Sequence, residues 1–357
     1  MKRIIPALFL FFLPLAFAAE NSNRLSAEVL WQLQRVGQPI VSPGGDHVVV
    51  PVTTYPEDGG DANSRLWLLG VDRDVVQRPL TAKEGNASGP VFSPDGSQLA
   101  FVRRVNKEDA PQIYKMPMRG PGEAVKLTDV PTGVSAIKWI GDHIYFISNV
   151  WPGMSFDEMK EKVEADKESK LSAKVWNEMP YSHWDSWIPE DRQNHLYRVH
   201  ETGGDVEALT LPMGIQLSRA DVDASDYDVS PDGTLLAFVA DGGEGGVYPD
   251  EDVFVSQIGS GKAKNVTEDN AAPDDLPKFS PDGRMLAFSR QHIAGFYADQ
   301  VKLIIHEVKS GKSRMVHRDW DRSAAGLTWA PDSKGMYGAI DDEGTRRIYY
   351  LPLNGDT

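Results

Sequence analysis

A short pattern recurs along this 357-residue chain at intervals of about 50 residues. Each copy has an apolar residue, a small residue and then Pro-Asp-Gly or a variant of it. The six copies begin at Val41, Phe92, Trp139, Val229, Phe279 and Trp329. The interval from Trp139 to Val229 is the one long interval, so we expect an insertion there. A repeat of this length is one structural unit of a propeller or a solenoid.

The residues around the pattern predict four strands in each repeat. Pro-Asp-Gly favours a tight turn, because Pro presets φ, Asp bonds its own backbone and Gly accepts a positive φ. Apolar strands follow the turn at 99–102, 235–239 and 285–288. A third strand comes about 20 residues later, and a short fourth strand closes most repeats. The prediction is an all-β fold, a β-propeller of four-stranded blades with about six repeats, the last one incomplete.

The N-terminus has the features of a secretory signal. Met1-Lys2-Arg3 precedes an apolar stretch at 4–17, and small residues lie around Ala18. We therefore predict a signal peptide at 1–18 and a periplasmic or secreted protein. A membrane anchor is the alternative, but the stretch is shorter than the roughly 20 residues that a spanning helix needs. It also contains Pro6 and Pro14.

Composition and charge narrow the classes of partner. The formal net charge of −15 disfavours nucleic acid and anionic membrane surfaces as partners. No other segment is apolar enough to cross a membrane, so no membrane association is expected once the signal is cleaved. The chain has no cysteine, which excludes stabilisation by disulfides.

Two segments lie outside the regular repeats. Residues 19–40 are expected to form a helical lead-in, with Ser26 placed to cap its helix, before a propeller that occupies 41–357. Residues 151–193 form the predicted insertion of the third repeat. There Ser155 and Glu158 have the spacing of a capping box, and apolar residues continue at helical spacing as far as Met179.

The insertion also contains a cluster of aromatic residues. Tyr181, Trp184 and Trp187, together with Asp185, are the candidate substrate-binding residues of the chain. On a propeller face, such rings would receive the side chains of a bound peptide. The alternative interpretation is that the rings only anchor the insertion to the propeller, since clustered aromatics dominate packing.

Motifs for catalysis, cofactors and metals are missing from the sequence. There is no G-x-S-x-G, so no catalytic residue is assigned, and the histidines have no nucleophile to serve. The glycine-rich segment 242–246 does not fit a dinucleotide fingerprint, and 311–313 lacks the first glycine of a phosphate loop. Residues 221–232 begin like an EF-hand loop but lack its glycine and final glutamate. We therefore expect no cofactor and no metal.

Two acidic segments, 249–252 and 273–275, are expected in loops between strands. The simplest interpretation is that they are solvated turns. Acidic groups at the mouth of a propeller could also attract the α-amino group of a peptide.

Several segments resemble the prolyl oligopeptidase family of serine peptidases. The resemblance begins at 30–36 and 39–43, includes 181–187, and continues through the repeats, as at 226–233. Within that family, the chain is similar to the bacterial acylaminoacyl- and dipeptidyl-peptidase-like members, which join an N-terminal propeller to a C-terminal α/β-hydrolase domain. In dipeptidyl-type relatives, carboxylates on the propeller side hold the substrate N-terminus, although the sequence does not indicate which acid would do so here.

This resemblance implies a substrate-gating propeller whose partners are short peptides and the hydrolase domain of a full-length protein. The catalytic serine would form an acyl-enzyme and would lie beyond residue 357, so this chain alone is expected to be inactive. A stand-alone periplasmic propeller resembling TolB, which binds protein partners, is the alternative. A propeller enzyme with its site in the central channel, such as a lactonase, is a third possibility.

Overall fold

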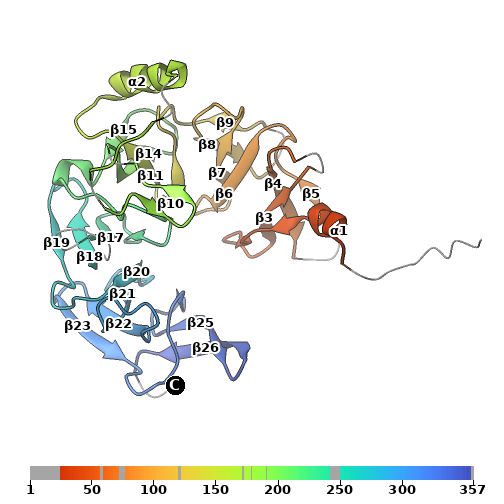
Figure 1. The fold of residues 1–357 in the computed structure, drawn as a ribbon. Helices are drawn as coiled ribbons and strands as arrows, with labels where there is room; N and C mark the ends of the chain where they lie inside the picture. Colours follow the sequence, from red (N-terminus) through yellow and green to blue (C-terminus); the bar gives the residue numbers. More distant parts are fainter. Residues whose placement is uncertain are drawn as a thin grey trace, which may run out of the picture.

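Six antiparallel sheets are arranged around a common centre as the blades of a propeller (Figure 1). The computed structural model describes residues 25–56, 59–71, 77–119, 122–170, 173–177, 179–189, 191–241 and 250–354. The predicted signal peptide lies outside these residues. Four sheets have four strands, the first has five and the last has three, so the predicted all-β propeller is confirmed.

Blades 1 to 3 come from the N-terminal half of the chain. Blade 1 contains β1 (Arg35–Val36), β2 (Ile40–Val41), β3 (His47–Thr54), β4 (Asn63–Gly70) and β5 (Arg78–Pro79). Blade 2 contains β6 (Asn86–Phe92), β7 (Gln98–Arg104), β8 (Gln112–Pro117) and β9 (Val125–Lys126). Blade 3 contains β10 (Ser135–Ile140), β11 (His143–Val150), β14 (Gln193–His200) and β15 (Val206–Ala208).

Blades 4 to 6 repeat the arrangement. Blade 4 contains β16 (Tyr227–Val229), β17 (Leu235–Asp241), β18 (Glu251–Gln257) and β19 (Ala263–Asn265). Blade 5 contains β20 (Asp274–Phe279), β21 (Met285–Arg290), β22 (Lys302–Glu307) and β23 (Lys312–Val316). Blade 6 contains β24 (Thr328–Trp329), β25 (Gly335–Asp342) and β26 (Thr345–Pro352).

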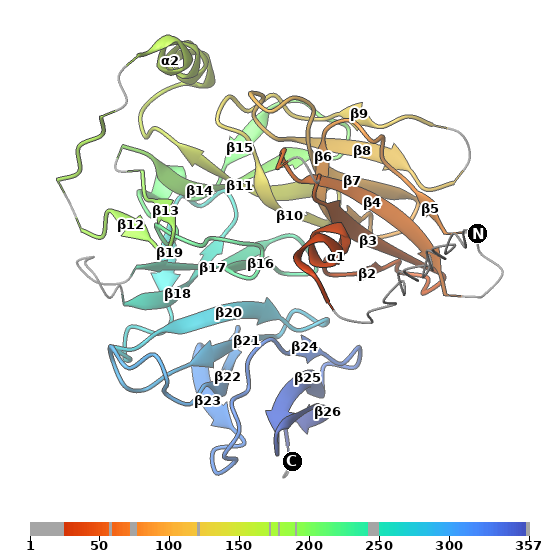
Figure 2. The ribbon, with the colours of Figure 1, turned by 45° about the vertical axis from the view of Figure 1, so that its right-hand side comes forward.

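Helices lie outside the blades. Helix α1 (Ala27–Gln32) begins at Ser26, whose side chain accepts a hydrogen bond from the Val29 N–H, and it leads into blade 1. Helix α2 (Phe156–Glu168) follows β11 and stands outside the ring of blades (Figure 2). The predicted helical insertion in the third repeat is therefore confirmed. A short 3-10 helix, η1 (Leu211–Met213), follows blade 3. No helix in the described part of the chain is long and apolar enough to span a bilayer.

The repeated turn forms as its residues predict. In blade 2 the Ser93 hydroxyl donates to Asp95 Oδ1 at 2.6 Å, and the Gln98 N–H donates back to Ser93 Oγ at 3.0 Å. The bond from Ser93, and then those from the Ser97 N–H and hydroxyl, lower the pKa of Asp95 to about 2. Gly96 has a φ of 69°, a conformation that favours glycine. The turn closes each hairpin between the first and second strands of a blade.

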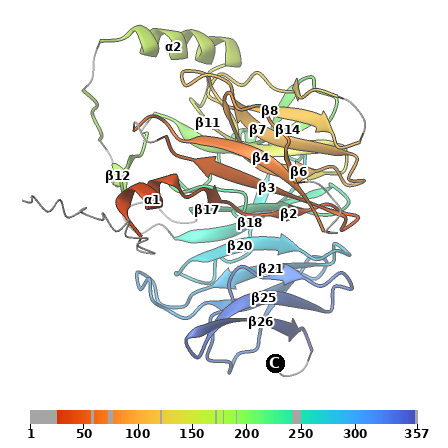
Figure 3. The same ribbon diagram turned by 90° about the vertical axis from the view of Figure 1, so that its right-hand side faces the viewer.

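Apolar side chains fill each space between successive blades. Five clusters of buried residues lie between blades 1 and 2, 2 and 3, 3 and 4, 4 and 5, and 5 and 6. Among the described residues no such cluster joins blade 6 to blade 1, and Figure 1 shows the ring open between them. Figure 3 shows the blades edge-on, with α2 at the top of the view and β26 at the bottom.

Hydrogen bonds also connect the inner strands of blades 3, 4 and 5. Asp228 in β16 lies 3.1 Å from Lys138 Nζ in β10 and accepts the Phe279 N–H of β20 at 2.8 Å. Both charged side chains are largely buried, with exposed fractions of 16% for Asp228 and 21% for Lys138. Asp228 of blade 4 therefore bonds to both neighbouring blades through their inner strands.

Candidate functional site

One end of the propeller bears the insertion and a group of carboxylates. At this end β11 ends at Val150, β17 ends at Asp241 and β20 begins at Asp274, whereas the Pro-Asp-Gly turns lie at the opposite end. We call this end the insertion face. It carries all the candidate substrate-binding residues of the sequence.

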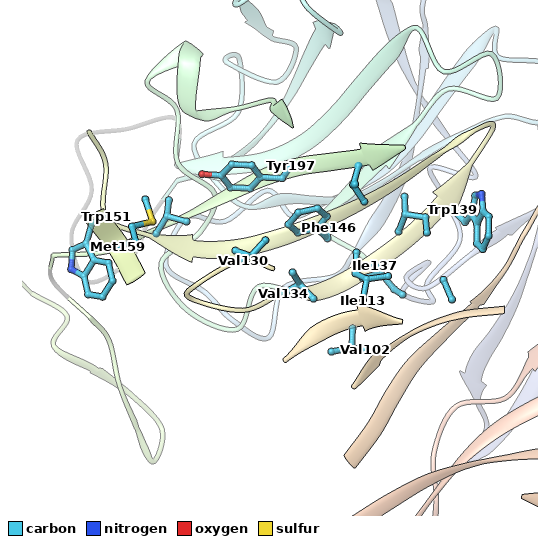
Figure 4. Packing of buried hydrophobic residues seen from close by; sticks show 14 residues of the cluster. Val102, Ile113, Val130, Val134, Ile137, Trp139, Phe146, Trp151, Met159 and Tyr197 are labelled. Atoms are coloured by element: carbon cyan, nitrogen blue, oxygen red, sulfur yellow. The ribbon is translucent and has the colours of Figure 1, made fainter. Parts of the chain in front are cut away.

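The insertion is anchored by the first turns of α2. Its capping box is formed as predicted, with the Glu158 N–H donating to Ser155 Oγ and the Glu158 carboxylate accepting the Ser155 N–H. Met159 is buried and packs in the core between blades 2 and 3, together with Trp151 (Figure 4). The Phe156 ring lies 6.0 Å from the Tyr197 ring. These contacts fix the helix to blade 3.

The helical prediction was wrong beyond residue 168. Apolar spacing predicted a helix as far as Met179, but α2 ends at Glu168 and residues 173–177 have no regular structure. The reason is that helical spacing stabilises a helix only when the apolar face is buried. Val175 and Met179 are exposed, with 78% and 55% of their surfaces accessible.

A small hairpin carries the aromatic cluster. Strands β12 (Ser182–His183) and β13 (Ser186–Trp187) pair, with Trp184 and Asp185 at the turn. The Trp187 ring stacks on Trp176 at 5.0 Å and on Tyr181 at 6.0 Å between ring centroids. Trp176 Nε1 donates to the Ile188 carbonyl at 2.7 Å. The hairpin is thus held by its own aromatic stack.

The four candidate residues lie together on this hairpin and remain accessible. Trp184 is 89% exposed and Trp187 is 61% exposed, while Tyr181 and Asp185 are also exposed. Trp184 stands apart from the stack; its ring neighbour is His183, at 6.3 Å. Met159, Phe156 and Trp151 anchor the first part of the insertion. The rings of Trp184 and Trp187 remain largely exposed.

Two contacts connect the hairpin to the loop before blade 4. His183 Nε2 lies 2.9 Å from the Asp221 carboxylate, and Arg219 donates to the Met179 carbonyl at 3.3 Å. In the same loop the Ser218 hydroxyl donates to Glu251 Oε1 at 2.8 Å. The loop therefore connects the aromatic hairpin with the carboxylates of blades 4 and 5.

The carboxylates of Asp226, Glu251 and Asp275 lie near one another at these blades, so each has neighbours of like charge. Burial, with Asp223 and Glu251 nearby, raises the pKa of Asp226 to about 6. Burial and then the charges of Glu251, Asp226 and Asp274 raise the pKa of Asp275 to about 7. A cationic group placed here would relieve the repulsion among them.

The prediction that the acidic segments are solvated turns in loops was wrong for Glu251, Asp252, Asp274 and Asp275, which all lie in strands. Asp252 lies in β18 and is 2% exposed, and Asp274 lies in β20 and is fully buried. Asp252 accepts the Thr267 hydroxyl at 2.6 Å, and Asp274 pairs with Arg290 Nε at 2.6 Å. Asp226, which sequence reasoning did not single out as a ligand group, lies one residue before β16. Its only sequence signal was the density of acids at 221–226.

Two buried histidines lie on blade strands. His195 in β14 is buried and its ring bonds the Thr210 hydroxyl at 3.0 Å. Burial lowers its pKa to about 4. His306 in β22 bonds the Ser313 hydroxyl at 2.9 Å. These contacts are those of ordinary strand residues. Among the described residues no group of three acids, histidines or cysteines is arranged to hold a metal ion.

Comparison with known proteins identifies relatives of the chain. No family model matches it. It is 25% identical over 349 residues to dipeptidyl-peptidase 5 of Porphyromonas gingivalis, an alignment that covers 93% of this chain and 48% of that protein. The chain spans about half the length of the curated relatives it matches.

Solved structures show the same fold. The acylaminoacyl peptidase of Pyrococcus horikoshii superposes with a TM-score of 0.65 at 14% identity, covering 91% of this chain and 46% of that one. The β-propeller domain of the Trilobed protease from Pyrococcus furiosus gives a TM-score of 0.58 at 12% identity, covering 90% and 82%. This chain is a β-propeller related to the propeller domains of dipeptidyl-peptidase 5 and of acylaminoacyl peptidases.

Proposed function

We propose that this propeller is the substrate-gating part of an exported serine peptidase that hydrolyses short peptides. The activity would be of the dipeptidyl- or acylaminoacyl-peptidase type. An α/β-hydrolase domain of the full-length protein would supply the nucleophilic serine and form the acyl-enzyme. Sequence similarity along 93% of the chain to half of a dipeptidyl-peptidase is the observation that carries this proposal.

The insertion face supplies groups for a peptide. Trp184, Trp187 and Tyr181 offer exposed rings for apolar side chains, since aromatic surfaces gain much free energy when covered. Asp226 and Asp275 are the carboxylates that would hold an α-ammonium group, with Glu251 beside them. Signal-like residues at the N-terminus support export to the periplasm or medium.

The hairpin rings give the first test of this proposal. Replacing Trp184 and Trp187 together by alanine is expected to weaken binding of short apolar peptides at least about tenfold, which corresponds to about 1.4 kcal/mol. The loss follows because the rings supply most of the exposed apolar surface of the hairpin. Titration of tri- to pentapeptides, followed by indole N–H signals in NMR spectra, measures the affinity.

A matched control separates a specific role from general adhesion to aromatics. Tyr337 is 48% exposed and lies near the start of β25, beside the turn at 331–333 at the opposite end of the propeller, so Tyr337→Ala should leave the affinity unchanged. N-acetylated peptides should bind more weakly than free ones if carboxylates hold the α-ammonium. Equal affinity of the native chain and the double variant would contradict the role given to the hairpin.

A further inference from the structure

A β-bulge in β20 sets the direction of two charged side chains. Asp275 lies opposite Ser289 of β21 and Lys278 lies opposite Ala287, so three residue steps along β20 match two steps along β21. Leu276, inside the bulge, has a φ of 56°. In a regular strand, residues 275 and 278 would point to opposite faces of the sheet, because side chains alternate. The extra residue of the bulge turns both side chains to the same face.

This face of β20 is turned toward blade 6. Ala287 belongs to the apolar core between blades 5 and 6, and Lys278 Nζ donates to the Leu327 carbonyl, just before β24, at 3.2 Å. The Trp329 indole N–H in turn donates to the Lys278 carbonyl at 2.9 Å. Blade 4 covers the opposite face (Figure 2). Because described blades flank β20 on both sides, this arrangement does not depend on the open part of the ring.

Lys278 competes with Lys138 for the charge of Asp228. One oxygen of Asp228 lies 3.1 Å from Lys138 Nζ, and the other accepts the Phe279 N–H at 2.8 Å. Burial, and then the charge of Lys138, lower the pKa of Lys278, while the charge of Asp228 acts in the opposite direction. An anion placed beside Lys278 would favour its charged form. Lys278 is therefore a cation that a bound carboxylate would stabilise.

Asp275 has the opposite preference and lies nearer the insertion face. Its carboxylate has Glu251, Asp226 and Asp274 nearby, so a cation placed beside it would stabilise the charged form. The partners of Asp275 and Lys278 in β21 are two residues apart, which corresponds to about 7 Å along the sheet. Neither of the two side chains is fully covered. A fully extended dipeptide spans at most about 7 Å, so its charged termini match both the spacing and the signs of these groups.

We propose that Asp275 and Lys278 bind a dipeptide by its two ends, with the α-ammonium group at Asp275 and the α-carboxylate at Lys278. The inference rests on the proposed function, from which it takes the ammonium-binding carboxylates, and adds that the C-terminus must also be free. The ligand class is thus a short zwitterionic peptide. A peptidase of the dipeptidyl type would release such a molecule, so this site would bind the product.

Titration of the full chain with L-alanyl-L-alanine in free, N-acetylated and C-terminally amidated forms tests the site. The Trp329 indole N–H signal in NMR spectra is the local reporter, because this group bonds to the Lys278 carbonyl. Amidation should weaken binding at least about tenfold, because it removes the charge that faces Lys278. N-acetylation should have a similar effect through Asp275. Neither comparison requires a change in the protein.

Lys278→Met tests the assignment of the carboxylate end. The variant should bind the free dipeptide at least about tenfold more weakly than the native chain does, but should bind the amide with unchanged affinity. Lys264→Met is the matched control. Lys264 is exposed on β19, the outer strand of blade 4, so its loss should alter neither affinity. An equal loss of affinity in the two variants would overturn the proposal in favour of general charge attraction.

The proposed function and this inference fail in different ways. If the amide binds the native chain as tightly as the free dipeptide does, the role of Lys278 is overturned while the ammonium site stands. If tri- to pentapeptides bind the hairpin but no dipeptide binds, the two-ended site is overturned and the proposed function stands. Absence of binding by peptides of every length would overturn both.

Discussion

Replacing Asp228 by alanine is expected to lower the free energy of unfolding by about 2–4 kcal/mol. The change leaves Lys138 without its carboxylate partner, 3.1 Å away, and leaves the Phe279 N–H without its acceptor, 2.8 Å away. Both groups are partly or fully buried, so water replaces the lost bonds poorly. Urea denaturation followed by circular dichroism measures the loss.

Asp228→Asn serves as the control for this prediction. The amide oxygen can still accept the Phe279 N–H, but the ion pair with Lys138 is lost, so an intermediate loss of stability is expected. If the alanine variant unfolds at the same urea concentration as the native chain, the bond network across blades 3 to 5 does not contribute to stability as described.

The second large effect concerns Asp275. Asp275→Asn is expected to raise the free energy of unfolding at pH 8 by on the order of 1–3 kcal/mol. Burial and neighbouring acids raise the pKa of Asp275 to about 7 in the folded chain, above the value of about 3.9 for an unfolded aspartate. The native state therefore binds more protons than the unfolded state between pH 4 and 7. This contribution is present below pH 4 and is lost as the pH rises through 7.

Unfolding measured at pH 5 and pH 8 separates this effect from a general change in packing. The asparagine variant should gain stability mainly at pH 8 and should show a flatter pH dependence. Asp185→Asn, at an exposed position on the hairpin turn, should change neither value. A variant that is less stable than the native chain at pH 8 would contradict the assigned like-charge repulsion around Asp275.

The blades were predictable from the sequence because their signals are local. Ser93, Asp95 and Gly96 form their turn with bonds among neighbours in the chain, so the spacing of residues was sufficient. The capping box at Ser155 was predictable for the same reason. The end of α2 was not, because helical spacing at Val175 does not reveal whether a surface exists to cover it.

The carboxylate group of the site was harder to foresee. Asp226, Glu251 and Asp275 come from three different segments of blades 4 and 5, and only the propeller brings them together. The raised pKa values of Asp226 and Asp275 depend on burial, which no local pattern encodes. The aromatic hairpin was predictable as a cluster, because Tyr181, Trp184 and Trp187 are close in sequence. The contact between His183 of this hairpin and Asp221 was not predictable.

Sequencing the source gene through codon 357 and beyond tests whether this propeller belongs to a serine peptidase. We expect an open frame that continues past Thr357 and encodes a G-x-S-x-G on a strand-to-helix turn, followed by the acid and the histidine of an α/β-hydrolase. A stop codon at that point, with no such sequence downstream, would contradict the claim that this propeller gates a serine peptidase.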